Sequence, residues 1–98
     1  MKKDELKKLT YEINQLLEAF NKTEWKKTFT YFINELNAIE SDAEIKSLAR
    51  EILSIYKGMG SFNDLVLQRE DRMPVYENER LDNLRKTLFD LAVNTITK

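Results

Sequence analysis

The side chains of this sequence that could take part in chemistry are carboxylates, lysines, arginines, tyrosines and serines, because the chain has no histidine and no cysteine. Imidazole and thiolate metal sites are therefore excluded, and so are Cys-His and Ser-His-Asp nucleophilic machines. Two carboxylates in a cleft could act as general acid and base, or hold a hard cation through oxygen ligands. The candidate acidic cluster lies in the second half of the chain and comprises Asp64, Glu70, Asp71, Glu77, Glu79 and Asp82.

The spacing of these carboxylates matches no calcium-binding loop, and a di-iron bundle would need Glu-x-x-His pairs. A solvated charged face explains them better. Gly58-x-Gly60 is not a dinucleotide-binding fingerprint, since it follows an expected helix rather than a strand and lacks the third glycine. We therefore expect no catalytic residues, no metal and no cofactor, and the sequence favours a protein that is not an enzyme.

The charge balance gives no general attraction to nucleic acid, with 16 basic and 17 acidic residues and a net charge of -1. Interleaved glutamates dilute a small patch near the N-terminus, formed by Lys2, Lys3, Lys7, Lys8, Lys22, Lys26 and Lys27. Arginine forms planar, bidentate contacts that lysine cannot. The better candidates for specific pairing are therefore Arg69, Arg72, Arg80 and Arg85, although ordinary surface charge is the simpler interpretation.

Membrane insertion and export are not expected. The longest apolar runs fall far short of the roughly 20 residues needed to span a bilayer. The N-terminal residues Met1–Glu5 are charged and lack the apolar region of a secretory signal. With no cysteine for disulfides, these features predict a soluble cytoplasmic protein.

Helices must position whatever site the chain has, because two glycines and one proline are too few for a strand-rich fold with many tight turns. Apolar residues recur at helical spacing in four segments. The prediction is one all-α domain over residues 1–98, a four-helix up-down bundle with an irregular segment between the third and fourth helices. The expected helices span residues 4–20, 23–39, 41–56 and 78–96.

Local signals mark the ends of these helices. Asn21 can close the first helix in a left-handed conformation. Thr23 is expected to cap the second helix, and Asn78 the fourth. Ser41 and Glu44 form a capping box at the start of the third. The segment Met73–Tyr76 is expected to be extended, because proline disfavours helix for the residue before it and cannot donate a hydrogen bond.

The Gly58–Leu67 loop is the one stretch that helical periodicity does not explain, and it holds both glycines. Gly58 suits a positive φ just past a helix end. Ser61 and Asp64 could cap a short turn that lets Phe62, Leu65 and Val66 plug the end of the bundle. An extended segment over Leu65–Leu67 is the alternative.

The loop can be a buried plug, a recognition loop on a rigid scaffold, or both. If it recognises a partner, Asn63 and Asp64 supply the polar contacts and Phe62 can anchor in either role. The predicted partner-binding residues are Ser61, Phe62, Asn63 and Asp64.

The stretch Gly-Met-Gly-Ser-Phe-Asn-Asp-Leu (58–65), followed by Asn-Glu-Arg-Leu-Asp-Asn-Leu (78–84), resembles a family of short bacterial helical proteins of the domain-of-unknown-function type, which often sit in polymorphic-toxin neighbourhoods. The resemblance covers about the second half of the chain and implies no established activity. Some small bacterial proteins of this size and style are immunity proteins that block a partner toxin. A nuclease toxin would favour a more acidic inhibitor than this chain.

The leading hypothesis is therefore a non-enzymatic protein–protein interaction module, of immunity or regulatory type. The alternative is a small carboxylate-based enzyme or cation-binding protein that uses Asp64 and the Glu77–Asp82 region. Surplus apolar surface on the second helix also allows a homodimer.

Overall fold

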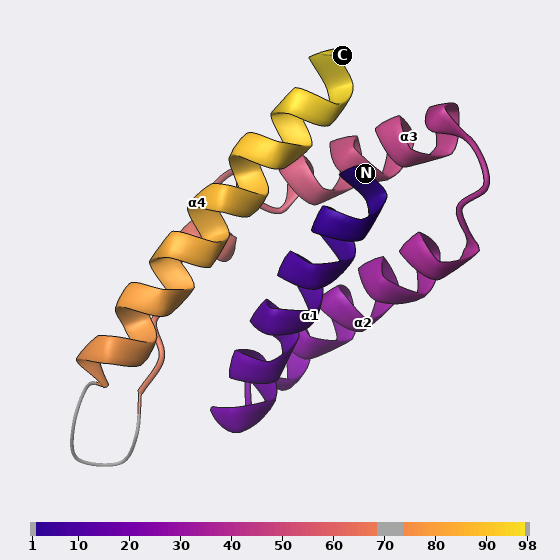
Figure 1. Cartoon of the computed structure of the whole chain (residues 1–98). Coiled ribbons are helices and arrows are strands. Elements are labelled where there is room, and N and C mark those ends of the chain that lie inside the picture. The colour runs from indigo at the N-terminus through magenta and orange to yellow at the C-terminus, as the bar shows by residue number, and fades with distance from the viewer. Residues whose placement is uncertain (1, 69–73, 98) are drawn as a thin grey trace.

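The computed structural model describes residues 2–68 and 74–97, and it is built from helices. These are α1 (Lys2–Ala19), α2 (Thr23–Ala38), α3 (Asp42–Ser54) and α4 (Val75–Thr97), with a short 3-10 turn, η1 (Phe62–Asp64), between α3 and α4 (Figure 1). No strand occurs in the described ranges. The predicted all-α class is confirmed.

The helices form an elongated bundle of 46 × 22 × 21 Å. α1 and α2 make an antiparallel hairpin, and α4 runs antiparallel to α1 (Figure 1). α1 packs against both α2 and α4, and α3 packs mainly against α4. Lys2 Nζ donates to the backbone oxygen of Asn94 at 3.2 Å and so ties the two ends of the chain together. Helix order and packing fit the predicted four-helix bundle.

The apolar stripes that predicted the helices form the core. The fully buried large side chains include two aromatic rings, Phe29 and Phe62. Two threonines are also buried, and each hydroxyl donates within its own helix: Thr10 to the Leu6 oxygen at 2.8 Å and Thr95 to the Leu91 oxygen at 2.8 Å. The threonines therefore enter the core without an unsatisfied hydroxyl.

The connection between α1 and α2 is a Schellman motif. Asn21 has φ +57°, as predicted, and the Lys22 amide donates to the Leu17 oxygen at 2.8 Å. The predicted Thr23 cap is wrong. α2 begins at Thr23 itself, and Lys22 occupies the N-cap position without a side-chain hydrogen bond. In so tight a connection Lys22 both ends the motif and starts the next helix, since its oxygen accepts from the Lys26 amide at 2.9 Å.

The start of α3 follows the capping-box prediction. The Ser41 hydroxyl oxygen accepts from the Glu44 amide at 3.2 Å. The Glu44 carboxylate accepts from the Glu40 amide at 3.2 Å, which lies one residue earlier than in the standard box. The same carboxylate also accepts from the Ser41 hydroxyl at 3.0 Å.

The start of α4 differs from the prediction. The helix begins at Val75, so Val75 and Tyr76 are helical rather than extended, while Met73 lies outside the described residues. Pro74 precedes the first turn, where a missing amide hydrogen costs nothing, and its oxygen accepts from the Asn78 amide at 3.0 Å. Asn78 is therefore not the cap. Across the described ranges, no helix is both long and apolar enough to cross a membrane.

Candidate functional site

The Gly58–Leu67 loop leaves the end of α3 through two glycines with positive φ, +85° at Gly58 and +71° at Gly60. The positive φ predicted for Gly58 is confirmed, although α3 ends earlier, at Ser54. The Phe62 amide then donates to the Ile55 oxygen at 2.9 Å and closes the loop onto the end of the helix. The backbone conformation here requires glycine, because other residues would be strained at these angles.

Phe62 is the plug of this loop. Its side chain is fully buried, and its ring lies against Trp25, Phe29 and Tyr56 at centroid distances of 5.2, 5.0 and 5.6 Å. The guanidinium carbon of Arg85 lies 5.6 Å from the same ring centroid. One side chain of the loop thus joins α2, the end of α3 and α4.

The predicted short turn after Ser61 is confirmed. The Ser61 hydroxyl oxygen accepts from the Asn63 amide at 3.3 Å, and the Asp64 carboxylate accepts from the Gly60 amide at 2.8 Å. The alternative, an extended segment over Leu65–Leu67, also has support, because the backbone is extended at Leu65 directly after the turn, although no strand is formed over these residues.

The aliphatic residues after the turn differ in part from the prediction. Leu65 is half-buried, Val66 is 43% exposed and Leu67 is fully buried. Leu67 therefore replaces Val66 as the aliphatic part of the plug, because side chains alternate in direction along the extended backbone that follows η1.

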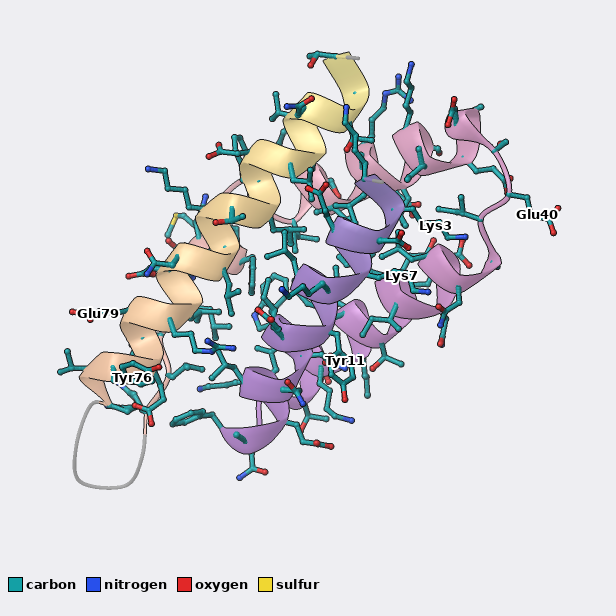
Figure 2. The ribbon with its side chains drawn as sticks, viewed as in Figure 1. Lys3, Lys7, Tyr11, Glu40, Tyr76 and Glu79 are labelled. Atoms are coloured by element: carbon teal, nitrogen blue, oxygen red, sulfur yellow. The ribbon has the colours of Figure 1, made fainter. Side chains whose placement is uncertain are left out.

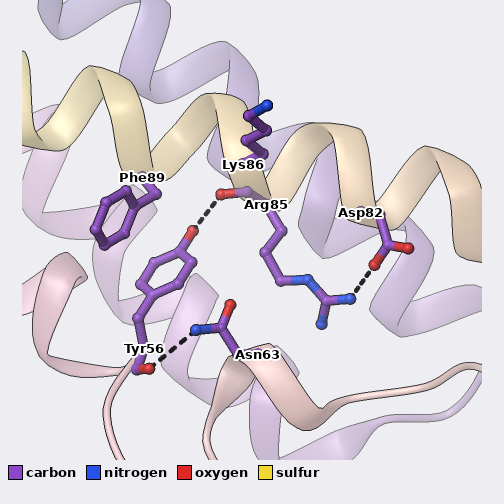
Figure 3. Close-up of a pocket in the computed structure, with 6 residues that line it drawn as sticks. All are labelled: Tyr56, Asn63, Asp82, Arg85, Lys86 and Phe89. Carbon is purple, nitrogen blue, oxygen red and sulfur yellow. Dashed lines mark hydrogen bonds and ion pairs between the residues drawn. The ribbon is translucent and has the colours of Figure 1, made fainter.

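Arg85 fastens the loop to α4. Its Nη1 donates to the backbone oxygens of Phe62 at 2.6 Å and Leu65 at 3.0 Å, and its Nη2 pairs with the Asp82 carboxylate (Figure 3). The Arg85 side chain is only 12% exposed. Hydrogen bonds from a charged donor are stronger than neutral ones, so this contact fixes the two loop carbonyls to α4.

Tyr56 makes a second connection between the loop and α4. Its hydroxyl donates to the Arg85 backbone oxygen at 2.7 Å, and its own backbone oxygen accepts from the Asn63 side-chain amide at 3.0 Å (Figure 3). Burial raises the pKa of the Tyr56 hydroxyl above its ordinary value; Arg85 opposes this shift and Asp90 adds to it. The hydroxyl therefore remains a proton donor throughout the neutral range.

Asn78 closes the far end of the loop. Its Oδ1 accepts from the Leu67 amide at 2.8 Å, and its Nδ2 donates to the oxygens of Leu67 at 2.9 Å and Pro74 at 3.0 Å. The side-chain amide pairs with the donor and the acceptor of one residue, as a neighbouring strand would. This explains why a short polar residue stands in the first turn of α4.

A surface hollow of about 280 Å³ lies between the loop and α4 (Figure 3). Phe89, which is 40% exposed, packs its ring against Tyr56 at 5.2 Å on one side of it. The hollow is lined by Tyr56, Asn63, Asp82, Arg85, Lys86 and Phe89.

The four predicted partner-binding residues divide into two pairs. Ser61 is 8% exposed and Phe62 is fully buried, whereas Asn63 and Asp64 are exposed. Two exposed apolar neighbours were missed. Met59 is completely exposed between the glycines, and Phe89 fits the apolar stripe of α4 but lies at its edge. The sequence did contain one sign that Met59 is exposed, because Met59 belongs to no helical stripe of apolar residues.

The predicted acidic cluster is not brought together as a metal site. The described residues contain no group of three or more acidic side chains able to hold a metal ion, and Glu70 and Asp71 lie outside them. Asp82 is engaged by Arg85, and Asp64 accepts from the Gly60 amide. Both carboxylates therefore already have partners within the fold.

Other exposed apolar and charged side chains lie outside the loop. Val75 and Tyr76 are exposed in the first turn of α4. Tyr76 lies far from Glu40, which is in the connection between α2 and α3 (Figure 2). In the N-terminal lysine patch, Lys26 pairs with Glu18 at 3.5 Å. Lys3, on α1, donates to the Ile39 oxygen at 2.9 Å.

A model of the family described as a domain of unknown function, DUF6966, matches residues 18–75. The match covers α2, α3 and the Gly58–Leu67 loop and reaches the first residue of α4. It includes the second helix, which the resemblance seen in the sequence left out, and it stops before residues 78–84, which that resemblance included. No curated protein and no solved structure matches the chain.

Proposed function

The chain belongs to the DUF6966 family, and we propose that it is a non-enzymatic interaction module of regulatory or immunity type that binds a partner protein. The contact is the loop surface, defined as Met59, Asn63, Asp64, Lys86 and Phe89. The observation that carries this proposal is the complete exposure of Met59 on a loop whose base is bonded to α3 and α4.

A loop fixed before binding loses little conformational freedom when it binds. The Gly58–Leu67 loop meets this condition, because Phe62 is buried among aromatic rings and Arg85 holds two of its carbonyls. Methionine and aromatic residues are enriched in protein interfaces, and methionine adapts its shape to a partner pocket. Met59 and Phe89 therefore supply apolar contacts, with polar groups around them.

The four predicted residues take different roles in this proposal. Asn63 and Asp64 present polar groups to a partner, while Ser61 and Phe62 hold the turn from inside. A substitution at Phe62 would therefore change partner binding indirectly, by moving the loop.

The alternative functions have less support. A carboxylate-based enzyme or cation-binding protein would need free acidic groups, and Asp64 and Asp82 are both engaged. For a homodimer through α2, the exposed large apolar side chain of that helix is Tyr31, whose hydroxyl donates to Glu51 at 2.9 Å. The loop surface, by comparison, includes two exposed apolar side chains, Met59 and Phe89.

The test is affinity capture from the source cell, with the full chain as bait and three variants run in parallel. Met59→Asp and Phe89→Asp place charges on the loop surface, and Tyr31→Asp places one on α2 as a matched control. Burying a methionine or phenylalanine side chain contributes about 1.5–3 kcal/mol, so each loop variant is expected to lower the affinity for a specific partner at least about tenfold. Failure to recover a stoichiometric partner, or equal recovery by all three variants, would contradict the proposal.

A further inference from the structure

Met59 carries the one sulfur atom among the residues that the structure describes, 2–68 and 74–97. Its side chain is 100% exposed. The glycines on either side have φ of +85° and +71°, and a Cβ built on either one would meet no heavy atom within 4 Å. Nothing in the surrounding fold therefore shields the thioether from a small reagent in solution.

We propose that Met59 is a methionine-oxidation site, at which a hydroperoxide converts the thioether to a sulfoxide while the fold stays intact. A sulfur lone pair attacks the outer oxygen of the peroxide, the O–O bond breaks and an S–O bond forms. The departing oxygen takes up a proton and leaves as water or an alcohol. Sulfur loses two electrons and the peroxide gains them, and methionine sulfoxide reductases can reverse the change.

The fold tolerates this change because none of the bonds that hold the loop involves the Met59 side chain. The loop is held by the buried ring of Phe62, by Arg85 on two carbonyls and by Asp64 on the Gly60 amide. Oxidation of a buried methionine disrupts a core, since a flexible apolar group becomes polar. At Met59 the same chemistry alters only the outer surface of the loop.

The consequence for binding rests on the proposed function. If Met59 enters an apolar pocket of a partner, the sulfoxide brings a polar oxygen into that pocket. The affinity is then expected to fall at least about tenfold, because the favourable burial of the thioether is lost. Oxidation would thus switch the loop surface off, and enzymatic reduction would restore it.

The oxidation itself is tested on the native full-length chain with hydrogen peroxide. Trypsin cuts after Lys57 and Arg69, so Met59 is the single methionine of its peptide and is resolved from Met1 and Met73 by mass. One added oxygen on this peptide is expected to appear within about threefold of the rate for N-acetylmethionine amide in the same tube, as full exposure requires. A rate more than about tenfold slower would overturn the proposal.

Thermal unfolding of the oxidised chain supplies the second readout. The midpoint is expected to stay within about 2 °C of the untreated chain, a shift that corresponds to a small fraction of its stability. Met59→Leu, treated in the same way, controls for oxidation elsewhere in the chain. If oxidation lowers the unfolding midpoint of the native chain by more than this, and does not lower that of Met59→Leu, then the loop depends on the Met59 side chain. That result would contradict the proposal.

The effect on binding is measured with the captured partner, comparing the reduced chain, the oxidised chain and Met59→Gln, a polar side chain of similar length. Weakened binding by the last two supports the switch. Normal oxidation with unchanged affinity would overturn the switch and the role of Met59 in the interface, but leave the oxidation site standing. Slow oxidation with a loss of binding in Met59→Gln would overturn the oxidation site and leave the proposed function standing.

Discussion

The hairpin of α1 and α2 and the Gly58–Leu67 loop on α4 are held in different ways. The hairpin is held by apolar stripes that meet along two regular helices, and its polar contact between Asn14 and Thr30 is long, at 3.4 Å, and exposed. The loop contributes only a few apolar side chains to the core. Its backbone is held instead by polar side chains, chiefly those of Arg85 and Asn78.

The difference follows from backbone hydrogen bonding. Regular helices satisfy their own amides and carbonyls, so apolar packing alone can join two of them. An irregular segment leaves these groups unpaired, and each one that is buried must find a partner elsewhere. In this chain, Arg85 and Asn78 of α4 pair with backbone groups of Phe62, Leu65 and Leu67, and the end of α3 and the loop itself supply the other partners. That arrangement lets the loop expose Met59 while its base stays fixed.

The largest expected effect comes from removing the plug. Phe62→Ala deletes a fully buried ring at the meeting point of three helices, and should lower the free energy of unfolding by about 3–5 kcal/mol. Phe89→Ala removes a ring that is 40% exposed and should cost about 1 kcal/mol. Urea titration followed by circular dichroism measures both. Similar losses for the two variants would show that the loop is not anchored through Phe62.

The next effect tests the bond from Arg85 to the loop. Arg85→Met keeps most of the side-chain volume but leaves two carbonyls without their charged donor, and should cost about 2–3 kcal/mol. Arg80→Met is the matched control, because Arg80 makes a long ion pair with Glu12 at 3.8 Å, and should cost less than about 1 kcal/mol. If urea titrations gave equal losses of unfolding free energy for the two variants, the bonds from Arg85 to the loop would not contribute to stability as proposed.

A smaller effect is expected at the far end of the loop. Asn78→Ala removes the amide that pairs with both backbone groups of Leu67 and should cost about 1–2 kcal/mol. Asn83→Ala, at an exposed position of the same helix, carries the same gain in helix propensity and should be neutral or slightly stabilising. Thermal unfolding of the two variants side by side isolates the pairing with Leu67. An Asn78→Ala chain as stable as Asn83→Ala would show that the pairing with Leu67 does not stabilise the fold.

The smallest effect appears in alkaline solution. The pKa of Tyr56 is raised in the folded chain, so the unfolded chain loses the phenol proton first. The stability that this group contributes is therefore fully present below about pH 10 and declines as the pH rises above that value. Tyr56→Phe should start less stable, lacking the bond to Arg85, but lose less stability between about pH 9 and 11. The pKa of Tyr31 is also raised, by its hydrogen bond to Glu51, and this contribution is common to both proteins.

Equal alkaline slopes for the two proteins would indicate that Tyr56 is exposed to solvent when folded. Urea titrations at several pH values provide the slopes, and the lysines contribute equally to both.

The regular part of the fold was predictable from the sequence because it depends on local rules. Helical spacing of apolar residues identified four helices, and the positive φ of Asn21 followed from its tolerance of the left-handed region. The cap by Ser41 and Glu44 followed from their spacing alone. These features need no knowledge of distant contacts.

The attachment of the loop was less predictable because it depends on residues far apart in the sequence. Asn78 fits the composition of a helix cap, and only the position of Leu67 shows that its amide serves another segment. Arg85 was a candidate for specific pairing, but its acceptors are backbone oxygens, which carry no sequence signal. The exposure of Phe89 likewise depends on where α3 ends.

The most direct test of the account is amide hydrogen exchange in the native chain. Among the loop amides that have acceptors, the Phe62 amide donates to the Ile55 oxygen and the Leu67 amide donates to the Asn78 side chain. Both should be protected to within about tenfold of the Leu84 amide in α4, while the exposed Met59 amide exchanges at close to the free-peptide rate. Free-peptide exchange at Phe62 and Leu67 would show that the end of α3 and Asn78 of α4 do not hold the loop in place.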